Sequence, residues 1–102
     1  MILSFDDEKA RKIFAGVPLT QKECGQLGGL PIPKAEARLQ MLHQATEKNL
    51  LTAASLHYHA LSGTARYSID ADSRKSKWRI TFTWQDATKK DVQLVRIQDT
   101  HK

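Results

Sequence analysis

The sequence is poor in cysteine, proline and glycine, and it has no long apolar run. Its 102 residues include one cysteine, three prolines and five glycines. Cys24 alone can form neither a disulfide within the chain nor a Cys-x-x-Cys metal site, which favours a reducing compartment, and we expect a cytoplasmic protein. No apolar stretch approaches the roughly 18 residues of a membrane-spanning helix. Because the start also turns acidic at Asp6, we expect neither export nor membrane insertion.

Acidic residues are also in the minority. Sixteen Lys and Arg stand against eleven Asp and Glu, which gives a formal net charge of +5. This excess favours polyanionic partners such as nucleic acid, although many small basic domains bind none. Hydrophobic residues make up 40% of the chain, as in globular proteins. The length suits one domain, residues 1–102.

The first third of the chain predicts a short strand, a helix and a loop. Residues 2–5 suit an edge strand, and Asp6 or Asp7 can cap a helix that follows. We expect this helix to end at Gly16. Residues 16–31 contain four glycines and two prolines without a clear period, which predicts an irregular loop.

A second helix is predicted from Pro33, which suits a first helical turn because its missing N–H would have no partner there. Apolar or small residues recur at helical spacing and should form the buried face: Ala35, Leu39, Met41, Leu42, Ala45 and Thr46. The opposite face is interpreted as solvated, with Lys34, Arg38, His43 and Lys48.

After about residue 55 the hydrophobic pattern alternates, which predicts strands near 56–62, 66–71, 78–84 and 92–98. Four residues of the third strand share an apolar face that we assign to the core: Trp78, Ile80, Phe82 and Trp84. Arg79, Thr81 and Thr83 share the polar face. The fold class is therefore α+β, with two N-terminal helices packed on one face of a small antiparallel sheet and the other face free for a ligand.

The densest positive charge lies just before and within the third strand, at Arg74, Lys75, Lys77 and Arg79. Cations beside a polar sheet face can hold phosphates, although a solvated turn explains the charges equally well. Arg79 stands within the strand, where a firmly held guanidinium could stabilise the charge of a phosphoryl transition state. A cross-strand ion pair or a simple exposed arginine is the simpler interpretation of Arg79 from the residues alone.

The histidines are candidates for proton transfer. His57 and His59 alternate on a predicted strand and so share a face, and imidazole exchanges protons near neutral pH. His-x-His could be half of a zinc site, but no cysteine or HExxH helix completes one, so we expect no metal and no cofactor. Asp99 precedes His101 by two residues and could orient its ring, although residues near a terminus often have no such role.

Several short motifs occur in an order that carries a resemblance. They are Met1-Ile2, Ser4-Phe5, Asp7, Ile13-Phe14, Leu30-Pro31, residues 38–42, Ala45-Thr46, residues 60–63, Tyr67-Ser68-Ile69, residues 78–82 and the ending Asp99-x-His101. In this order and spacing, over nearly the whole chain, the sequence resembles HigB-type toxins of the RelE/ParE superfamily.

The resemblance implies a RelE-like fold and a ribosome-dependent endoribonuclease that inhibits translation. Such an enzyme cleaves mRNA without a metal, by attack of the 2′-hydroxyl, and leaves a 2′,3′-cyclic phosphate and a 5′-hydroxyl. The implied partners are a HigA-type helix-turn-helix antitoxin, mRNA, and the ribosome with its 16S rRNA. Promoter DNA would be bound only through the antitoxin.

Matched by position, the resemblance also implies roles for individual residues. His59 and His101 share the general base and acid roles, Arg79 stabilises the phosphorane-like charge, and Asp99 orients an imidazole. Five residues are expected to contact RNA or the ribosome: His57, Arg66, Arg74, Lys75 and Lys77.

The chain departs from the family at Thr100, where tyrosine is usual, and in a longer hairpin before Trp78. The turn after Gly63 is shorter, and residues 16–31 have an atypical composition. One alternative is a non-catalytic inhibitor of DNA gyrase on the same scaffold, like ParE-type relatives, because a fold does not determine a function. Another is a degenerate toxin that binds RNA or ribosomes without cleaving.

Overall fold

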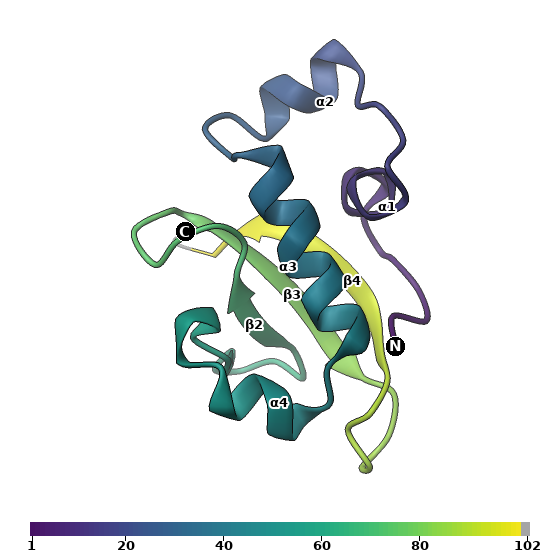
Figure 1. Ribbon diagram of the computed structural model, residues 1–102, viewed down its shortest axis with the longest axis vertical. Coiled ribbons are helices and arrows are strands. Elements are labelled where there is room, and N and C mark those ends of the chain that lie inside the picture. Colours follow the sequence, from purple (N-terminus) through teal and green to yellow (C-terminus); the bar gives the residue numbers. More distant parts are fainter. Residues whose placement is uncertain (101–102) are drawn as a thin grey trace.

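The second half of the chain forms an antiparallel sheet with the strand order β1-β2-β3-β4 (Figure 1). The structure is a computed structural model and describes residues 1–100. The strands are β1 (His59–Ala60), β2 (Tyr67–Asp70), β3 (Trp78–Trp84) and β4 (Val92–Asp99). Each lies in a region that the alternating pattern predicted. The first is much shorter than expected, because a 3-10 helix, η1 (Ala54–Leu56), occupies the start of its region.

The N-terminal segment lies along the free edge of β4. Ile2 and Phe5 make isolated parallel bridges to Val92 and Val95, so the segment has the predicted edge position without becoming a regular strand. Helix α1 (Glu8–Ala15) follows. Its first turn is capped by Asp7, which accepts a hydrogen bond from the backbone N–H of Lys9 at 3.1 Å.

Gly16 ends α1 in the left-handed region at φ 73°, which a glycine adopts without steric cost, so both predicted ends of this helix are confirmed. The loop predicted for residues 16–31 is wrong in part, because helix α2 (Gln21–Gln26) forms within it. Thr20 and Glu23 make a reciprocal capping box that satisfies two backbone N–H groups at the start of α2.

Helix α3 (Ile32–Gln44) begins as predicted, with Pro33 in its first turn, and buries Ala35, Leu39 and Leu42. Met41 is 44% exposed, so the buried stripe is narrower than predicted. The chain does not stay helical to Thr46. Instead Thr46 caps a fourth helix, α4 (Glu47–Thr52), with Asn49 as its capping partner. Residues 1–100 thus contain four α-helices where the sequence predicted two.

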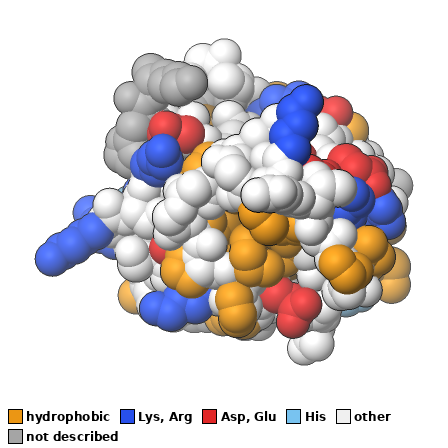
Figure 2. All heavy atoms as spheres, turned by 90° about the horizontal axis from the view of Figure 1, so that it is seen from above, with side chains coloured by type: hydrophobic (Ala, Val, Ile, Leu, Met, Phe, Trp, Pro, Cys, Tyr) orange, Lys and Arg blue, Asp and Glu red, His pale blue; other side chains and the backbone are white. Residues whose placement is uncertain are grey.

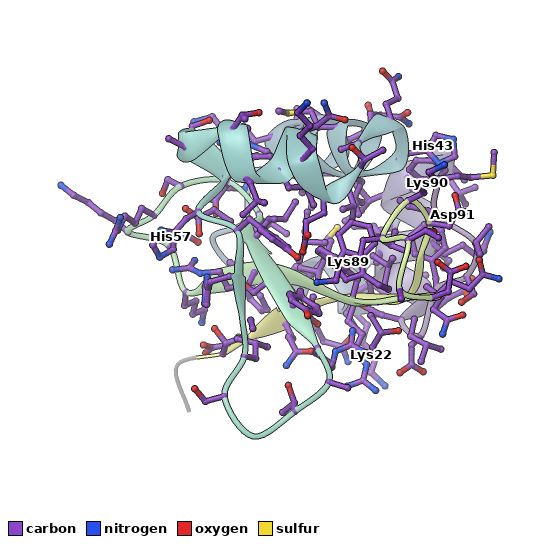
Figure 3. The ribbon with its side chains drawn as sticks, turned by 90° about the horizontal axis from the view of Figure 1, so that it is seen from below. Lys22, His43, His57, Lys89, Lys90 and Asp91 are labelled. Atoms are coloured by element: carbon purple, nitrogen blue, oxygen red, sulfur yellow. The ribbon has the colours of Figure 1, made fainter. Side chains whose placement is uncertain are left out.

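Helices α3 and α4 lie on one side of the sheet, and the core fills the space between them (Figures 1 and 3). Trp78, Ile80 and Phe82 are buried there as predicted, and Trp84 packs against the core. The aromatic residues of this face also contact one another. The rings of Tyr58 and Tyr67 stack with their centroids 5.6 Å apart.

The outer face of α3 is less solvated than predicted. The guanidinium of Arg38 donates to the carbonyl oxygens of Ser55, Asp70 and Asp72 at 3.3 to 3.4 Å. Nδ1 of His43 accepts a hydrogen bond from a backbone N–H of the N-terminal segment. Both side chains therefore join α3 to distant parts of the chain, while Lys34 and Lys48 are exposed as predicted. Within residues 1–100, no helix has both the length and the apolar character needed to cross a bilayer.

Candidate functional site

The face of the sheet opposite α3 is polar. The strand register aligns one residue from each strand across this face: His59, Ser68, Thr81 and Arg96. The neighbouring row contains Asp70, Arg79 and Gln98. No helix of the described residues is drawn over this face in Figure 3. We call it the polar sheet face, and it carries most of the predicted site.

His59 lies at the β1 edge of the polar sheet face and is exposed. Its Nδ1 is 2.9 Å from the backbone carbonyl oxygen of His57. A carbonyl oxygen only accepts hydrogen bonds, so Nδ1 of His59 carries the proton and Nε2 keeps a lone pair in the neutral ring. This arrangement makes Nε2 of His59 a candidate general base.

His57 is not on the strand, contrary to the prediction. It follows η1 with φ 53°, a left-handed conformation that is uncommon for residues with a side chain. Its ring nevertheless lies beside that of His59, with 5.0 Å between centroids. In Figure 3 His57 lies on one side of the molecule, far from Lys90 and Asp91 on the other.

Arg66 lies across the middle of the polar sheet face. Its Nε and Nη2 donate to Oγ1 of Thr81 at 3.2 and 2.9 Å, and Nη2 also donates to the carbonyl oxygen of Leu94 at 2.6 Å. Burial and then the positive charge of Arg96 lower the pKa of Arg66. A cation that is partly desolvated and close to another cation favours the approach of an anion.

Arg79 lies in the same face but is only 6% exposed. Its guanidinium donates to the carbonyl oxygens of Arg74, Ser76 and Trp78, and Nε lies 3.3 Å from the buried carboxylate of Asp70. These contacts are the cross-strand ion pair that the residues alone suggested. As placed, the guanidinium is engaged by the protein and does not reach an open surface.

The remaining predicted cations lie on the exposed connection between β2 and β3. Arg74, Lys75 and Lys77 are exposed there. Nη1 of Arg74 is 3.4 Å from Nδ1 of His57, and Nζ of Lys77 lies over the indole ring of Trp78. The structure thus brings Arg74 to the two histidines, whereas Lys77 points to the end of the sheet near Trp78.

The C-terminal pair is only partly described. Asp99 is opposite Trp78 in the register, so it belongs to the face that carries Ile80 and Ile97, whereas Arg79 and His59 belong to the other face. His101 lies outside the described residues. The structure brings His57, His59 and Arg74 together, and it does not place Asp99 on the same face as Arg79.

Sequence reasoning missed Arg96 as part of this site. Arg96 pairs with Asp6 through Nε and Nη2. Strict alternation over residues 92–98 would have put Arg96 on the same face as Val92. A bulge between the two strands near Leu94, whose φ is 54°, shifts the alternation and turns Arg96 to the polar sheet face.

The hollows of the described surface lie elsewhere. One of about 350 Å³ lies between α3 and α4, lined by Met41, Ala45 and Leu50 among others. Another lies between α1, α2 and α3, and Figure 2 shows apolar side chains gathered at the α2 end of the molecule. Within residues 1–100, no three His, Cys, Asp or Glu side chains are grouped so as to hold a metal ion.

The chain was also compared with known proteins. No protein-family model, curated protein or solved structure matches it. The resemblance to HigB-type toxins therefore stays a prediction from the motifs, and the site is argued from its own geometry.

Proposed function

We propose that the protein is the toxin of a type II toxin-antitoxin system with a RelE-like fold. In this proposal it is a metal-independent endoribonuclease that cleaves mRNA on the ribosome by attack of the 2′-hydroxyl. One observation carries the proposal: His59 is exposed at the edge of a basic sheet face, and the hydrogen bond at its Nδ1 leaves Nε2 as a proton acceptor.

The charges beside His59 support an RNA substrate. Arg66 and Arg96 lie on the same sheet face, and Arg74 lies beside His57. Guanidinium groups neutralise backbone phosphates and so supply most of the affinity that does not depend on sequence. We assign phosphate binding to Arg66 and Arg96, with Arg74, Lys75 and Lys77 as outer contacts to RNA or the ribosome.

The proposal changes the role of Arg79. Because its guanidinium is bonded to carbonyl oxygens and paired with Asp70, it supports the loop that carries Arg74. The general acid role stays with His101, oriented by Asp99. The proposed partners are mRNA, the ribosome and a HigA-type antitoxin that would also connect the toxin to promoter DNA.

The test is induction of the protein in growing cells, followed by mapping of mRNA 5′ ends. Wild type should give new ends inside translated codons, and His59→Ala and His101→Ala should not. Lys34→Ala is the matched control, since Lys34 is an exposed cation of α3. Wild-type arrest without new ends would refute the nuclease.

The alternative is an inhibitor of DNA gyrase on the same scaffold. The hydrogen bonds from Arg79 to the hairpin carbonyl oxygens favour this alternative, because the guanidinium of Arg79 is then not available to bind a phosphate. Growth arrest with intact messages and an SOS response would support this alternative.

A further inference from the structure

His57 has a hydrogen-bonding arrangement opposite to that of His59. Its Nδ1 lies 3.4 Å from Nη1 of Arg74, and an arginine can only donate. Nδ1 of His57 is therefore the acceptor, and in the neutral ring the proton is on Nε2. The ring of His59 thus has a lone pair at Nε2, whereas the neighbouring ring of His57 has an N–H at Nε2.

The backbone produces this difference. His57 is in the left-handed region, at φ 53°, and its own carbonyl oxygen lies 2.9 Å from Nδ1 of His59. His57 thus orients the ring of His59 through its backbone carbonyl oxygen. The ring of His57 is itself oriented by Arg74 from the β2–β3 connection. The two ring centroids are 5.0 Å apart, so both edges can reach one small group.

We propose that His57 acts as a neutral hydrogen-bond donor to the phosphate that is cleaved. Its Nε2–H binds a nonbridging oxygen of that phosphate, while Nε2 of His59 accepts the proton of the adjacent 2′-hydroxyl. Arg74 is a positioning residue that holds His57 in the tautomer that can donate. This inference rests on the proposed RNA cleavage and adds a catalytic residue to it.

The chemistry balances without a metal. The bond from O2′ to phosphorus forms as the bond from phosphorus to O5′ breaks, and the 2′-hydroxyl proton passes to His59. The leaving O5′ takes a proton from His101 or water. His57 gains and loses no proton, because losing the Nε2 proton of a neutral ring would leave an imidazolate. Its hydrogen bond instead stabilises the negative charge that grows on the nonbridging oxygen.

The surroundings of the pair are simple. Among the described residues, the side chain of Arg74 contacts the ring of His57, and the rings of His57 and His59 contact each other. The other contact is between Nδ1 of His59 and the backbone carbonyl oxygen of His57. Ser68 of β2 lies opposite His59 in the register and does not titrate.

The kinetic test compares His57→Gln with His57→Ala in cleavage of mRNA on purified ribosomes. Both variants carry the same backbone strain, but only the glutamine keeps an N–H donor near the position of Nε2. We expect His57→Ala to lose about 100-fold in rate, as when one donor to a developing oxyanion is removed. His57→Gln should recover most of that loss. His59→Gln should stay inactive, because an amide cannot accept the proton.

A second measurement reads the tautomers directly. Nitrogen-15 shifts of the imidazoles at neutral pH should show a protonated Nε2 in His57 and a protonated Nδ1 in His59. Arg74→Gln should shift the Nδ1 resonance of His57 and lower the cleavage rate.

Each other outcome is informative. Undiminished cleavage by His57→Ala, or a glutamine variant as slow as the alanine variant, overturns the inference while the nuclease stands. A protonated Nδ1 in neutral His57 would overturn it as well. A wild-type protein that cleaves no RNA overturns the proposed function and this inference together.

Discussion

Arg79 and Asp70 form a buried ion pair between β3 and β2. Nε of Arg79 lies 3.3 Å from Oδ1 of Asp70, and the two side chains are 8% and 1% exposed. The residues are directly opposite in the register. Within the described chain, neither carboxylate oxygen receives a hydrogen bond, so the attraction between the charges holds the pair. The pair closes the base of the connection that carries Arg74.

Asp70→Ala should strongly destabilise the protein, because it leaves a buried guanidinium without its counter-ion. Removing one partner of a buried pair costs about 3 to 5 kcal/mol. Urea denaturation measures the change in the free energy of unfolding. Arg74→Ala, on the exposed connection, should change it by less than about 0.5 kcal/mol. Equal stability of Asp70→Ala and wild type would show that Arg79 does not depend on Asp70.

Arg66→Ala should weaken RNA binding and reduce its dependence on salt. Loss of one phosphate contact lowers the slope of log affinity against log salt by about 1. Fluorescence anisotropy with a single-stranded RNA at several salt concentrations measures both quantities. Lys34→Ala makes the same charge change on the exposed surface of α3 and should leave the slope unchanged. If both variants behave alike, net charge and not the polar sheet face binds RNA.

Glu23 should contribute stability that depends on pH. A hydrogen bond from Lys12, followed by one from the backbone of Thr20, lowers the pKa of Glu23 from 4.5 to about 2. A lowered carboxyl pKa stabilises the fold above the ordinary pKa, and the effect disappears as pH falls through the folded value. Thermal melts should show Glu23→Gln melting below wild type at pH 7, with a difference that shrinks from pH 4.5 toward pH 2. Lys12→Met should reduce the difference at pH 7, and a difference independent of pH would contradict the assignment.

Asp7 joins α1 to β4. Oδ1 of Asp7 accepts the N–H of Lys9 and Oδ2 accepts the N–H of Ile97, each at 3.1 Å. Asp7→Ala should cost about 1 to 2 kcal/mol, because the helix cap is lost. Asp7→Asn should recover part of that loss, since its amide oxygen can still cap the N–H of Lys9, whereas its Nδ2 cannot accept the N–H of Ile97. Chemical denaturation of both variants measures this, and an asparagine variant as unstable as the alanine variant would mean that the helix cap contributes little beside the hydrogen bond to Ile97 and the charge.

Local sequence signals predicted much of the fold. The alternation over residues 78–84 identified the buried face of β3, and Asp7, Gly16 and Pro33 marked helix ends correctly. The capping box of Thr20 and Glu23 was also present in the sequence. Such a capping box is a signal for a helix start. The glycines around Thr20 and Glu23 nevertheless favour a loop, which is why the sequence did not predict α2.

The candidate site was predicted less completely. The sequence predicts the two histidines and Arg74 as site residues, but no local pattern indicates that Arg74 orients His57. Arg96 was missed because the bulge near Leu94 reverses the alternation, and a bulge depends on the pairing of two strands.

Local sequence patterns were enough to predict α1, α3, the strand regions and the residues of β3 that face the core, because those properties depend on neighbours one to four positions away. Contacts formed by chain folding place the guanidinium of Arg79 against Asp70 and the hairpin carbonyl oxygens, and give the rings of His57 and His59 different protonated nitrogens. Burial and hydrogen bonding of a side chain depend on groups brought close by chain folding, and a one-dimensional pattern does not contain those distances.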